Sequence, residues 1–180
     1  MLWIEKHRPR RFEDVAGQER VMEHLATFAA TRNVPHLLVC GPHGTGKSAA
    51  VECFARSLYG EFWEENTTVI PAADLFGEGK RYLEADERFG HLYRRDLTLL
   101  ANFKHVVKWY ASLRPLGAEF KLMVFEGAEG LTKDAQAALR RTDGRPGALS
   151  GADRRRPASE LEAGQALERL DDRGVVRLAE

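Results

Sequence analysis

The stretch HLLVCGPHGTGKS, residues 36–48, decides the fold of this 180-residue chain. It opens with an apolar run, 36–40, in which polar and apolar side chains do not alternate. Such a run is typical of a parallel strand that is covered on both faces. Glycines follow at once, and residues 48–58 then carry apolar side chains at helical spacing. The pattern predicts a strand, a glycine-rich loop and a helix in direct succession.

The glycine-rich loop has the pattern G-x-x-x-x-G-K-[ST], which is typical of a phosphate-binding loop between a strand and a helix. Its glycines let backbone N–H groups converge on phosphates, and the helix N-terminus adds partial positive charge. Lys47 would reach the β- and γ-phosphates, and Ser48 would supply an oxygen to Mg²⁺. Kinases, GTPases and ATPases share this loop, so the reaction stays open at this point. The predicted phosphate-binding residues are Gly41, His43, Gly44, Thr45, Gly46, Lys47 and Ser48.

The rest of the first 142 residues alternates helix and strand patterns. Apolar side chains recur on one helical face over 19–30, and short apolar runs predict strands at 67–71 and 120–125. Residues 79–110 have a mainly helical pattern. Strands that alternate with helices predict an α/β domain with a parallel sheet flanked by helices.

Composition excludes several classes of protein. The chain is 43% hydrophobic, enough for a core, and its 27 basic and 27 acidic side chains cancel, so net charge favours neither a nucleic-acid nor a membrane partner. Cys40 and Cys53 lack the paired spacing of a zinc site and are predicted to be buried thiols in a reducing compartment. Neither a signal peptide nor a membrane span is apparent, so we expect no membrane partner and a cytoplasmic protein.

The character of the sequence changes after Thr142. Residues 143–180 contain no aromatic side chain and are dominated by Arg, Ala, Gly, Asp and Glu. Such a segment is expected to be weakly ordered, with at most one surface helix over 159–170. The sequence therefore predicts a nucleotide-binding domain over 1–142 and a divergent tail of low order over 143–180.

Three segments around the phosphate-binding loop together resemble one known family. They are WIEKHRPRRFEDVAGQE at 3–19, VPHLLVCGP at 34–42, and LTKDAQAALRRT at 131–142, in which Thr132 is also predicted to cap a helix. Their order resembles the AAA+ ATPases, and specifically the small subunit of replication factor C, a clamp loader. The resemblance runs from Leu2 to Thr142 and is weaker over a longer middle segment, 75–110.

The resemblance implies a function and a set of partners. It implies ATP and Mg²⁺ as cofactors, and ATP-driven loading of a sliding clamp onto primer-template DNA in concert with other clamp-loader subunits. It implies a nucleoid-associated protein in an archaeon and a nuclear one in a eukaryote. It also implies that an adenine base lies against Arg8, Pro9, Val15 and Ala16. The candidate contacts to the DNA backbone are Lys80, Arg81, Lys104, Lys108, Arg140 and Arg141.

The catalytic carboxylates depart from the family pattern. The family strand ends in Asp-Glu, a metal-side carboxylate followed by a general base, whereas this chain has Glu126 and then Gly127. Losing a positioned base typically slows a reaction by about 10²–10⁴-fold. Glu129 replaces the base only if the turn rearranges, and a shifted register makes Glu126 the base and places Phe125 at the metal position. Lys47 and Glu126 are the catalytic candidates, and Ser48 and Glu126 the metal ligands.

A second departure follows Thr142, where the resemblance ends as if truncated. The family continues into a strand with sensor 1, an arginine finger, a lid and a collar domain, so we expect the α/β sheet to be incomplete at its C-terminal side. A shifted reading frame near codon 142 is one hypothesis, and translation of the neighbouring frame tests it. Two alternatives to clamp loading stay open: a catalytically silent fragment that binds ATP or a partner, and another P-loop protein such as a Holliday-junction helicase motor or a nucleotide kinase.

Overall fold

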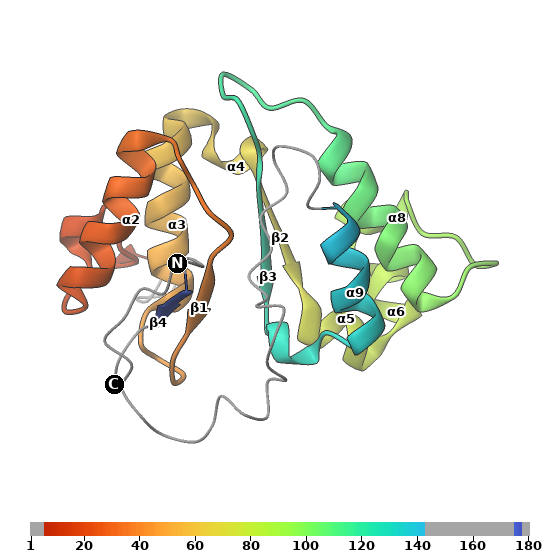
Figure 1. The fold of residues 1–180 in the computed structure, drawn as a ribbon. Coiled ribbons are helices and arrows are strands. Elements are labelled where there is room, and N and C mark those ends of the chain that lie inside the picture. Colours follow the sequence, from red (N-terminus) through yellow and green to blue (C-terminus); the bar gives the residue numbers. More distant parts are fainter. Residues whose placement is uncertain (1–5, 143–174, 178–180) are drawn as a thin grey trace.

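The computed structural model describes residues 6–142 and 175–177 (Figure 1). The longer helices are α2 (Glu19–Thr31), α3 (Lys47–Tyr59), α8 (Leu99–Ser112) and α9 (Lys133–Thr142). Shorter helices are α4 (Trp63–Asn66), α5 (Ala72–Glu78), α6 (Lys80–Ala85) and α7 (Glu87–Gly90). Single 3₁₀ turns are η1 (Phe12–Asp14), η2 (Gly60–Phe62) and η3 (Ala128–Gly130). The strands are β1 (Leu38–Cys40), β2 (Thr67–Pro71), β3 (Leu122–Glu126) and β4 (Val175–Arg177).

The strands form two parallel pairs. β2 pairs with β3 in a register that places Thr67 opposite Leu122 and Pro71 opposite Glu126. β1 pairs with β4, with Leu38 opposite Val175. β1 and β3 both run toward the lower edge of Figure 1, so the loop after β1 and the turn after β3 lie at the same end of the molecule. The predicted α/β class with parallel strands is confirmed.

Helices cover both faces of the β2–β3 pair (Figure 1). α2 and α3 lie on one face, and α5, α6, α8 and α9 lie on the other. Strand β3 joins these two layers because its successive side chains point to opposite faces. Leu122 and Val124 belong to the apolar cluster with α2 and α3, whereas Met123 and Phe125 belong to the cluster with α8 and α9. Burial on both faces explains the continuous apolar run of this strand.

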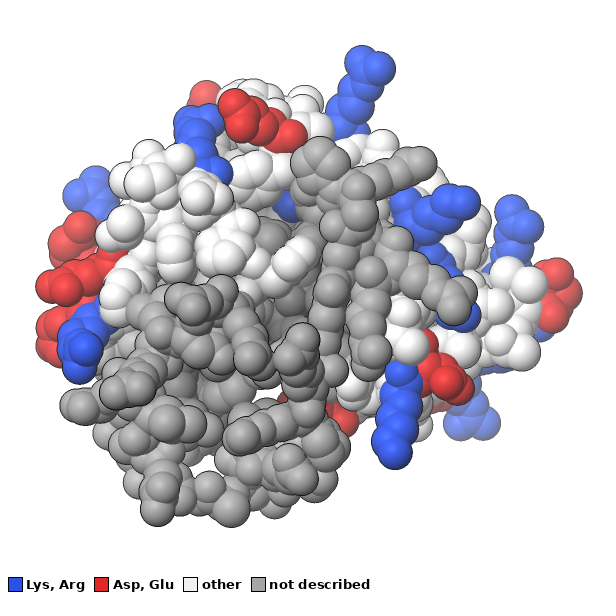
Figure 2. All heavy atoms as spheres, viewed as in Figure 1, with Lys and Arg blue, Asp and Glu red and all other residues white. Residues whose placement is uncertain are grey.

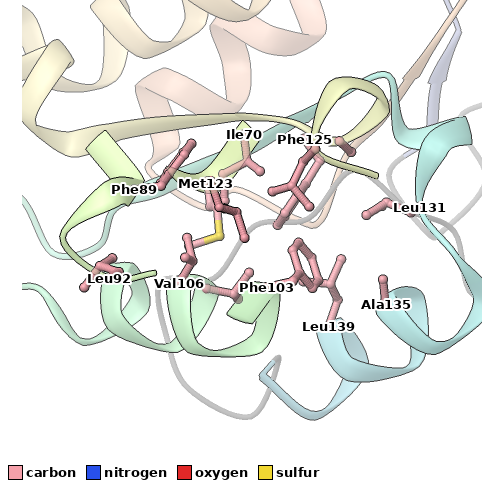
Figure 3. Close-up of a cluster of buried hydrophobic side chains, with 14 residues drawn as sticks. Ile70, Phe89, Leu92, Phe103, Val106, Met123, Phe125, Leu131, Ala135 and Leu139 are labelled. Atoms are coloured by element: carbon pink, nitrogen blue, oxygen red, sulfur yellow. The ribbon is translucent and has the colours of Figure 1, made fainter. Parts of the chain in front are cut away.

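The larger apolar cluster fills the space between β2–β3 and α8–α9 (Figure 3). Phe103 of α8 is fully buried and lies 5.3 Å from the ring of Phe76 and 6.1 Å from that of Phe125, measured between centroids. Aromatic pairs at this separation add stabilisation beyond that of buried area. Leu131, Ala135 and Leu139 extend the cluster to α9. The short helices between β2 and β3 are therefore anchored to the sheet by one continuous core.

Most predicted elements lie close to the observed ones. The first predicted strand shortens to Leu38–Cys40, and the third begins two residues later than predicted, at Leu122. The helical stretch predicted at 79–110 divides into α6, α7 and α8: Asp86 separates α6 from α7, and a turn and loop over 91–98 separate α7 from α8. Cys53 is buried as predicted, but the prediction for Cys40 was wrong, because this side chain on the short strand β1 is only half-buried. The helix predicted at 159–170 lies outside the described residues.

Within the described ranges, 6–142 and 175–177, none of the helices combines the length and the apolar character that crossing a membrane requires.

Candidate nucleotide-binding site

The phosphate-binding loop joins the end of β1 to the first turn of α3, as its sequence pattern predicts. Gly44 and Gly46 have φ angles of +85° and +84°, a left-handed conformation that favours glycine. Among the described residues, no atom lies within 4 Å of a Cβ added at either position. The loop backbone therefore borders open space, into which a phosphate group could approach. This geometry fits the predicted ligand.

Lys47 is the first residue of α3, and its side chain folds back over the loop. Its ammonium group donates to the carbonyl oxygen of Gly41 at 2.7 Å and to that of Pro42. The hydroxyl of Thr45 also donates to the Pro42 carbonyl, at 2.9 Å. These bonds hold a positive charge beside the helix N-terminus. Ser48 is exposed in the next position of the helix.

The N-terminal segment, residues 6–18, is attached to the same helix. Arg8 forms an ion pair with Glu52 of α3, with 2.6 Å between Nε and Oε2. The thiol of Cys53, the next residue of α3, donates to the carbonyl oxygen of Arg11 at 3.4 Å. Burial and the neighbouring Glu52 raise the pKa of this thiol to about 11, so it remains protonated and able to donate at neutral pH.

The residues predicted to meet the adenine base all lie in this segment. Val15 is half-buried and packs against the apolar cluster of α2 and α3, and Pro9 is half-buried as well. Arg8 and Ala16 are exposed. The structure thus places the predicted base-binding segment on the helix that begins with the phosphate-binding loop.

Glu126 and Gly127 lie where β3 ends. Glu126 is exposed as the last residue of the strand. Gly127 has a φ of +63° and precedes η3, in which Glu129 is exposed. The exposed carboxylate of Glu126 has the oxygen chemistry that Mg²⁺ prefers. Among the described residues, no group of three or more His, Cys, Asp and Glu side chains forms a metal site by itself.

A neighbouring helix closes the position after Glu126, where the family resemblance predicts a general base. A Cβ added to Gly127 would lie 2.7 Å from the Cβ of Ala73, in the first turn of α5. A Cβ added to Gly130 would lie 2.6 Å from the Cα of the same residue. Real Cβ atoms do not approach other atoms so closely, so the turn after β3 needs glycine at both positions. Glycine at position 127 is therefore part of how η3 packs on α5.

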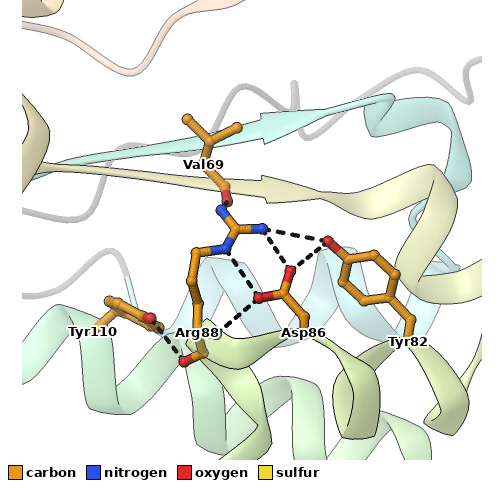
Figure 4. A network of polar contacts seen from close by, with 5 residues as sticks. All are labelled: Val69, Tyr82, Asp86, Arg88 and Tyr110. Atoms are coloured by element: carbon orange, nitrogen blue, oxygen red, sulfur yellow. Dashed lines mark hydrogen bonds and ion pairs between the residues drawn. The ribbon is translucent and has the colours of Figure 1, made fainter.

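A separate polar network ties α6 and α7 to the strand β2 (Figure 4). The Arg88 guanidinium donates to both oxygens of Asp86, at 3.0 and 2.7 Å, and to the carbonyl oxygen of Val69 in β2 at 3.1 Å. The Tyr82 hydroxyl donates to Asp86 at 2.9 Å, and that of Tyr110 donates to the Arg88 carbonyl at 3.1 Å. Chiefly because Arg88 donates hydrogen bonds to it, the pKa of Asp86 falls from 3.8 to about 2.

The candidate DNA contacts lie apart from the phosphate-binding loop. Lys104 and Lys108 are exposed one turn apart on α8, a helix whose sequence contains no Asp or Glu. Lys80 donates to the carbonyl oxygen of Arg95 at 3.2 Å, and Arg81 is exposed beside it. On the face seen in Figure 2, basic and acidic side chains are both distributed around the periphery of the described surface. The side chains of Arg140 and Arg141 lie outside the described residues.

Two features of the site were not anticipated from the sequence. Glu52 and Arg56 lie four residues apart on α3, a spacing that signals an ion pair but not its extension to Arg8. The contact of Ala73 with the turn after β3 has no signal in the sequence, because it joins segments that are distant along the chain.

The predicted cap of α9 is confirmed, since the N–H of Ala135 donates to the Thr132 hydroxyl at 3.3 Å.

Parallel strands with helices on both faces, together with a glycine-rich loop at a helix N-terminus, define an α/β P-loop NTPase fold. Within this class, residues 1–113 match the family model described as the Rad17 P-loop domain, and the chain belongs to this family.

Curated relatives extend the similarity to residues beyond that match. The chain is 43% identical over 143 residues to the replication factor C small subunit of Methanosarcina barkeri, 40% identical over 143 residues to that of Methanosarcina mazei, and 37% identical over 142 residues to that of Archaeoglobus fulgidus. These alignments cover 78% of this chain but only 36–38% of the relatives. The chain therefore spans just over a third of their length, and the predicted resemblance to the replication factor C small subunit is confirmed.

Proposed function

We propose that the chain binds ATP with Mg²⁺ as part of a clamp-loader subunit, in which ATP is used to load a sliding clamp onto primed DNA. The observation that carries this proposal is the glycine-rich loop and Lys47 at the start of α3, in a chain similar to replication factor C small subunits. Other clamp-loader subunits, the sliding clamp and primer-template DNA are the proposed partners.

Each site residue has a distinct proposed role. Backbone N–H groups of Gly44, Thr45 and Gly46 bind phosphate oxygens, and Lys47 exchanges its carbonyl partners for the β- and γ-phosphates. The exposed side chains of Ser48 and Glu126 would hold Mg²⁺ through their oxygens, and the ion when bound would neutralise charge on the phosphates. The adenine base lies against Arg8, Pro9, Val15 and Ala16 in the N-terminal segment.

Titration with labelled ATP in the presence of Mg²⁺ tests the binding step. We expect saturable binding by the wild-type chain and a loss of about tenfold or more in affinity for Lys47→Ala, because the lysine contacts phosphate charge directly. Lys104→Ala on α8 is a matched control, since it removes a lysine outside the site and should bind ATP as the wild type does. Equal affinities of Lys47→Ala and the wild type contradict the proposal.

The packing of Gly127 against Ala73 favours a second candidate, a domain that binds ATP without hydrolysing it. No carboxylate follows Glu126 directly, and the space for one is taken by α5. Measuring phosphate release in the samples that bind ATP separates the two candidates. Turnover at a rate above that of Lys47→Ala excludes the silent domain, whereas binding without turnover supports it.

Clamp loading differs from the action of another P-loop motor or kinase in what stimulates it. A clamp-loader subunit is expected to respond to a sliding clamp and primed DNA when its partner subunits are present. A nucleotide kinase is expected to transfer phosphate to a nucleotide and to ignore the clamp. Measuring turnover in a reconstituted complex, with and without the clamp, separates these alternatives.

A further inference from the structure

The helix α3 carries two groups of contacts that serve different parts of the site. Its first turn begins with Lys47, directly after the phosphate-binding loop. Glu52 and Cys53, just over one turn further along the helix, contact the N-terminal segment at Arg8 and Arg11. Both parts are therefore mounted on one rigid element. The contacts at Glu52 and Cys53 hold residues 8–11 of the segment, and the apolar side chains of Phe12 and Val15 pack against the cluster formed with α2 and α3.

Glu52 is held on both sides. Its Oε1 accepts from Nε and Nη2 of Arg56 at 3.1 and 2.9 Å, while Oε2 faces Arg8 at 2.6 Å. The Arg56 guanidinium in turn lies 4.0 Å from the ring centroid of Trp63, a cation–π contact that restricts its movement. A carboxylate fixed in this way presents its second oxygen to the N-terminal segment in one orientation.

The ion pair with Arg8 is not needed to neutralise Glu52. The Glu52 side chain is 14% exposed and requires a partner, which Arg56 supplies within the same helix. Arg8 is 47% exposed, and a pair with so much solvent around it adds little to stability. The consequence of the contact is therefore positional, because Arg8 lies in the stretch 8–10, which has no regular secondary structure, and the ion pair fixes this stretch against α3.

We propose that Glu52 is a positioning residue that holds the N-terminal segment, through Arg8, beside the phosphate-binding loop so that the segment can contact a base. This inference rests on the proposed nucleotide-binding function and assigns one residue to the recognition of the base. Glu52 touches neither the base nor the phosphates. Its loss weakens binding of ligands that have a base and leaves ligands made only of phosphate unaffected.

Competition titrations with ATP and with inorganic tripolyphosphate, both with Mg²⁺, test the assignment. The measured quantity is the ratio of the two dissociation constants, because tripolyphosphate uses the loop alone. Glu52→Gln is expected to reduce the preference for ATP about tenfold and to change tripolyphosphate affinity by less than about twofold. Glu52→Asp keeps the charge on a shorter side chain, so its preference for ATP should lie between that of the wild type and that of Glu52→Gln. Glu23→Gln on α2 is the matched control and should retain the full preference.

Each outcome decides a separate point. If Glu52→Gln keeps the wild-type preference for ATP, or if it weakens ATP and tripolyphosphate equally, Glu52 is merely structural and the inference is overturned. If the wild type binds both ligands with equal affinity, phosphate binding stands but the base-binding role of the N-terminal segment fails, and the inference with it. If the wild type binds neither ligand, the proposed function itself fails. Thermal unfolding of each variant without ligand verifies that it is folded.

Discussion

Gly127 and Gly130 show how a single residue can decide both packing and chemistry. Both glycines face Ala73, and a side chain at either position would overlap the first turn of α5. The first of these positions is where the family resemblance predicts a general base. The departure seen in the sequence is thus linked to a backbone approach that a carboxylate side chain would prevent.

Gly127→Ala is expected to destabilise the fold by about 2 kcal/mol or more, because it adds both a strained φ and a steric overlap. The urea midpoint of unfolding measures this effect. Gly77→Ala is the matched control, since Gly77 lies within α5 and an added Cβ would meet no atom of the described part of the chain within 4 Å. It should be neutral or stabilising by up to about 1 kcal/mol. Similar losses in the two variants would contradict the packing argument.

At the scale of elements, the Asp86–Arg88 network anchors α7 to β2 and has a definite pH dependence. The pKa of Asp86 lies below its ordinary value of 3.8, so the folded state binds fewer protons than the unfolded chain in this range. The contribution of Asp86 to stability is therefore complete above pH 5 or so and is lost as pH falls from about 4 to about 2.

Comparing Asp86→Asn with the wild type isolates that contribution. Because solvent reaches half of the Arg88 side chain, we expect the wild type to be more stable at neutral pH by only about 1 kcal/mol. The difference should shrink as pH falls toward about 2. Urea unfolding at a series of pH values measures it, with Asp96→Asn in an exposed loop as the control. Parallel curves for wild type and Asp86→Asn would exclude this role for the network.

The helix α8 carries two of the lysines proposed to contact the DNA backbone. It exposes Lys104 and Lys108 one turn apart and has no acidic residue to oppose them. In the double variant Lys104→Ala/Lys108→Ala, we expect the slope of log affinity for primed DNA against log salt to fall by about 2, since each phosphate contact contributes about one. Fluorescence anisotropy at several salt concentrations measures the slope. Arg20→Ala on α2 should leave it unchanged, and an unaltered slope in the double variant would remove α8 from the interface.

At the scale of the whole molecule, two apolar clusters lie on opposite faces of β2–β3. The proposed site belongs to one face, because α3 and the N-terminal segment pack with α2 in the smaller cluster. The larger cluster joins α8 and α9 to the other face. A ligand in the phosphate-binding loop should therefore affect the two faces unequally.

Hydrogen exchange with and without MgATP measures this asymmetry. We expect slower exchange in the loop, α3 and residues 6–18, and little change in α8, because the ligand stabilises only what it contacts or anchors. Lys47→Ala should show no ligand-dependent change at any position. Uniform protection across both faces would mean that the clusters behave as one cooperative unit.

Much of this protein is determined by its sequence alone, because the signals are local. The G-x-x-x-x-G-K-[ST] pattern between an apolar run and a helix predicts the phosphate-binding loop, and Thr132 predicts the cap of α9. The apolar run before Glu126 predicts a buried parallel strand, although its first residue was misplaced by two. Such features depend on neighbours a few residues away, which the sequence shows directly.

The tertiary structure alone decided which distant segments meet. Ala73 reaches Gly127 because β2 and β3 are parallel and in register, so the elements that follow them emerge side by side. Arg8 reaches Glu52 because η1 and the residues before it lie along α3. Contacts of this kind depend on how helices and strands pack, and no periodicity or motif in a single sequence encodes them.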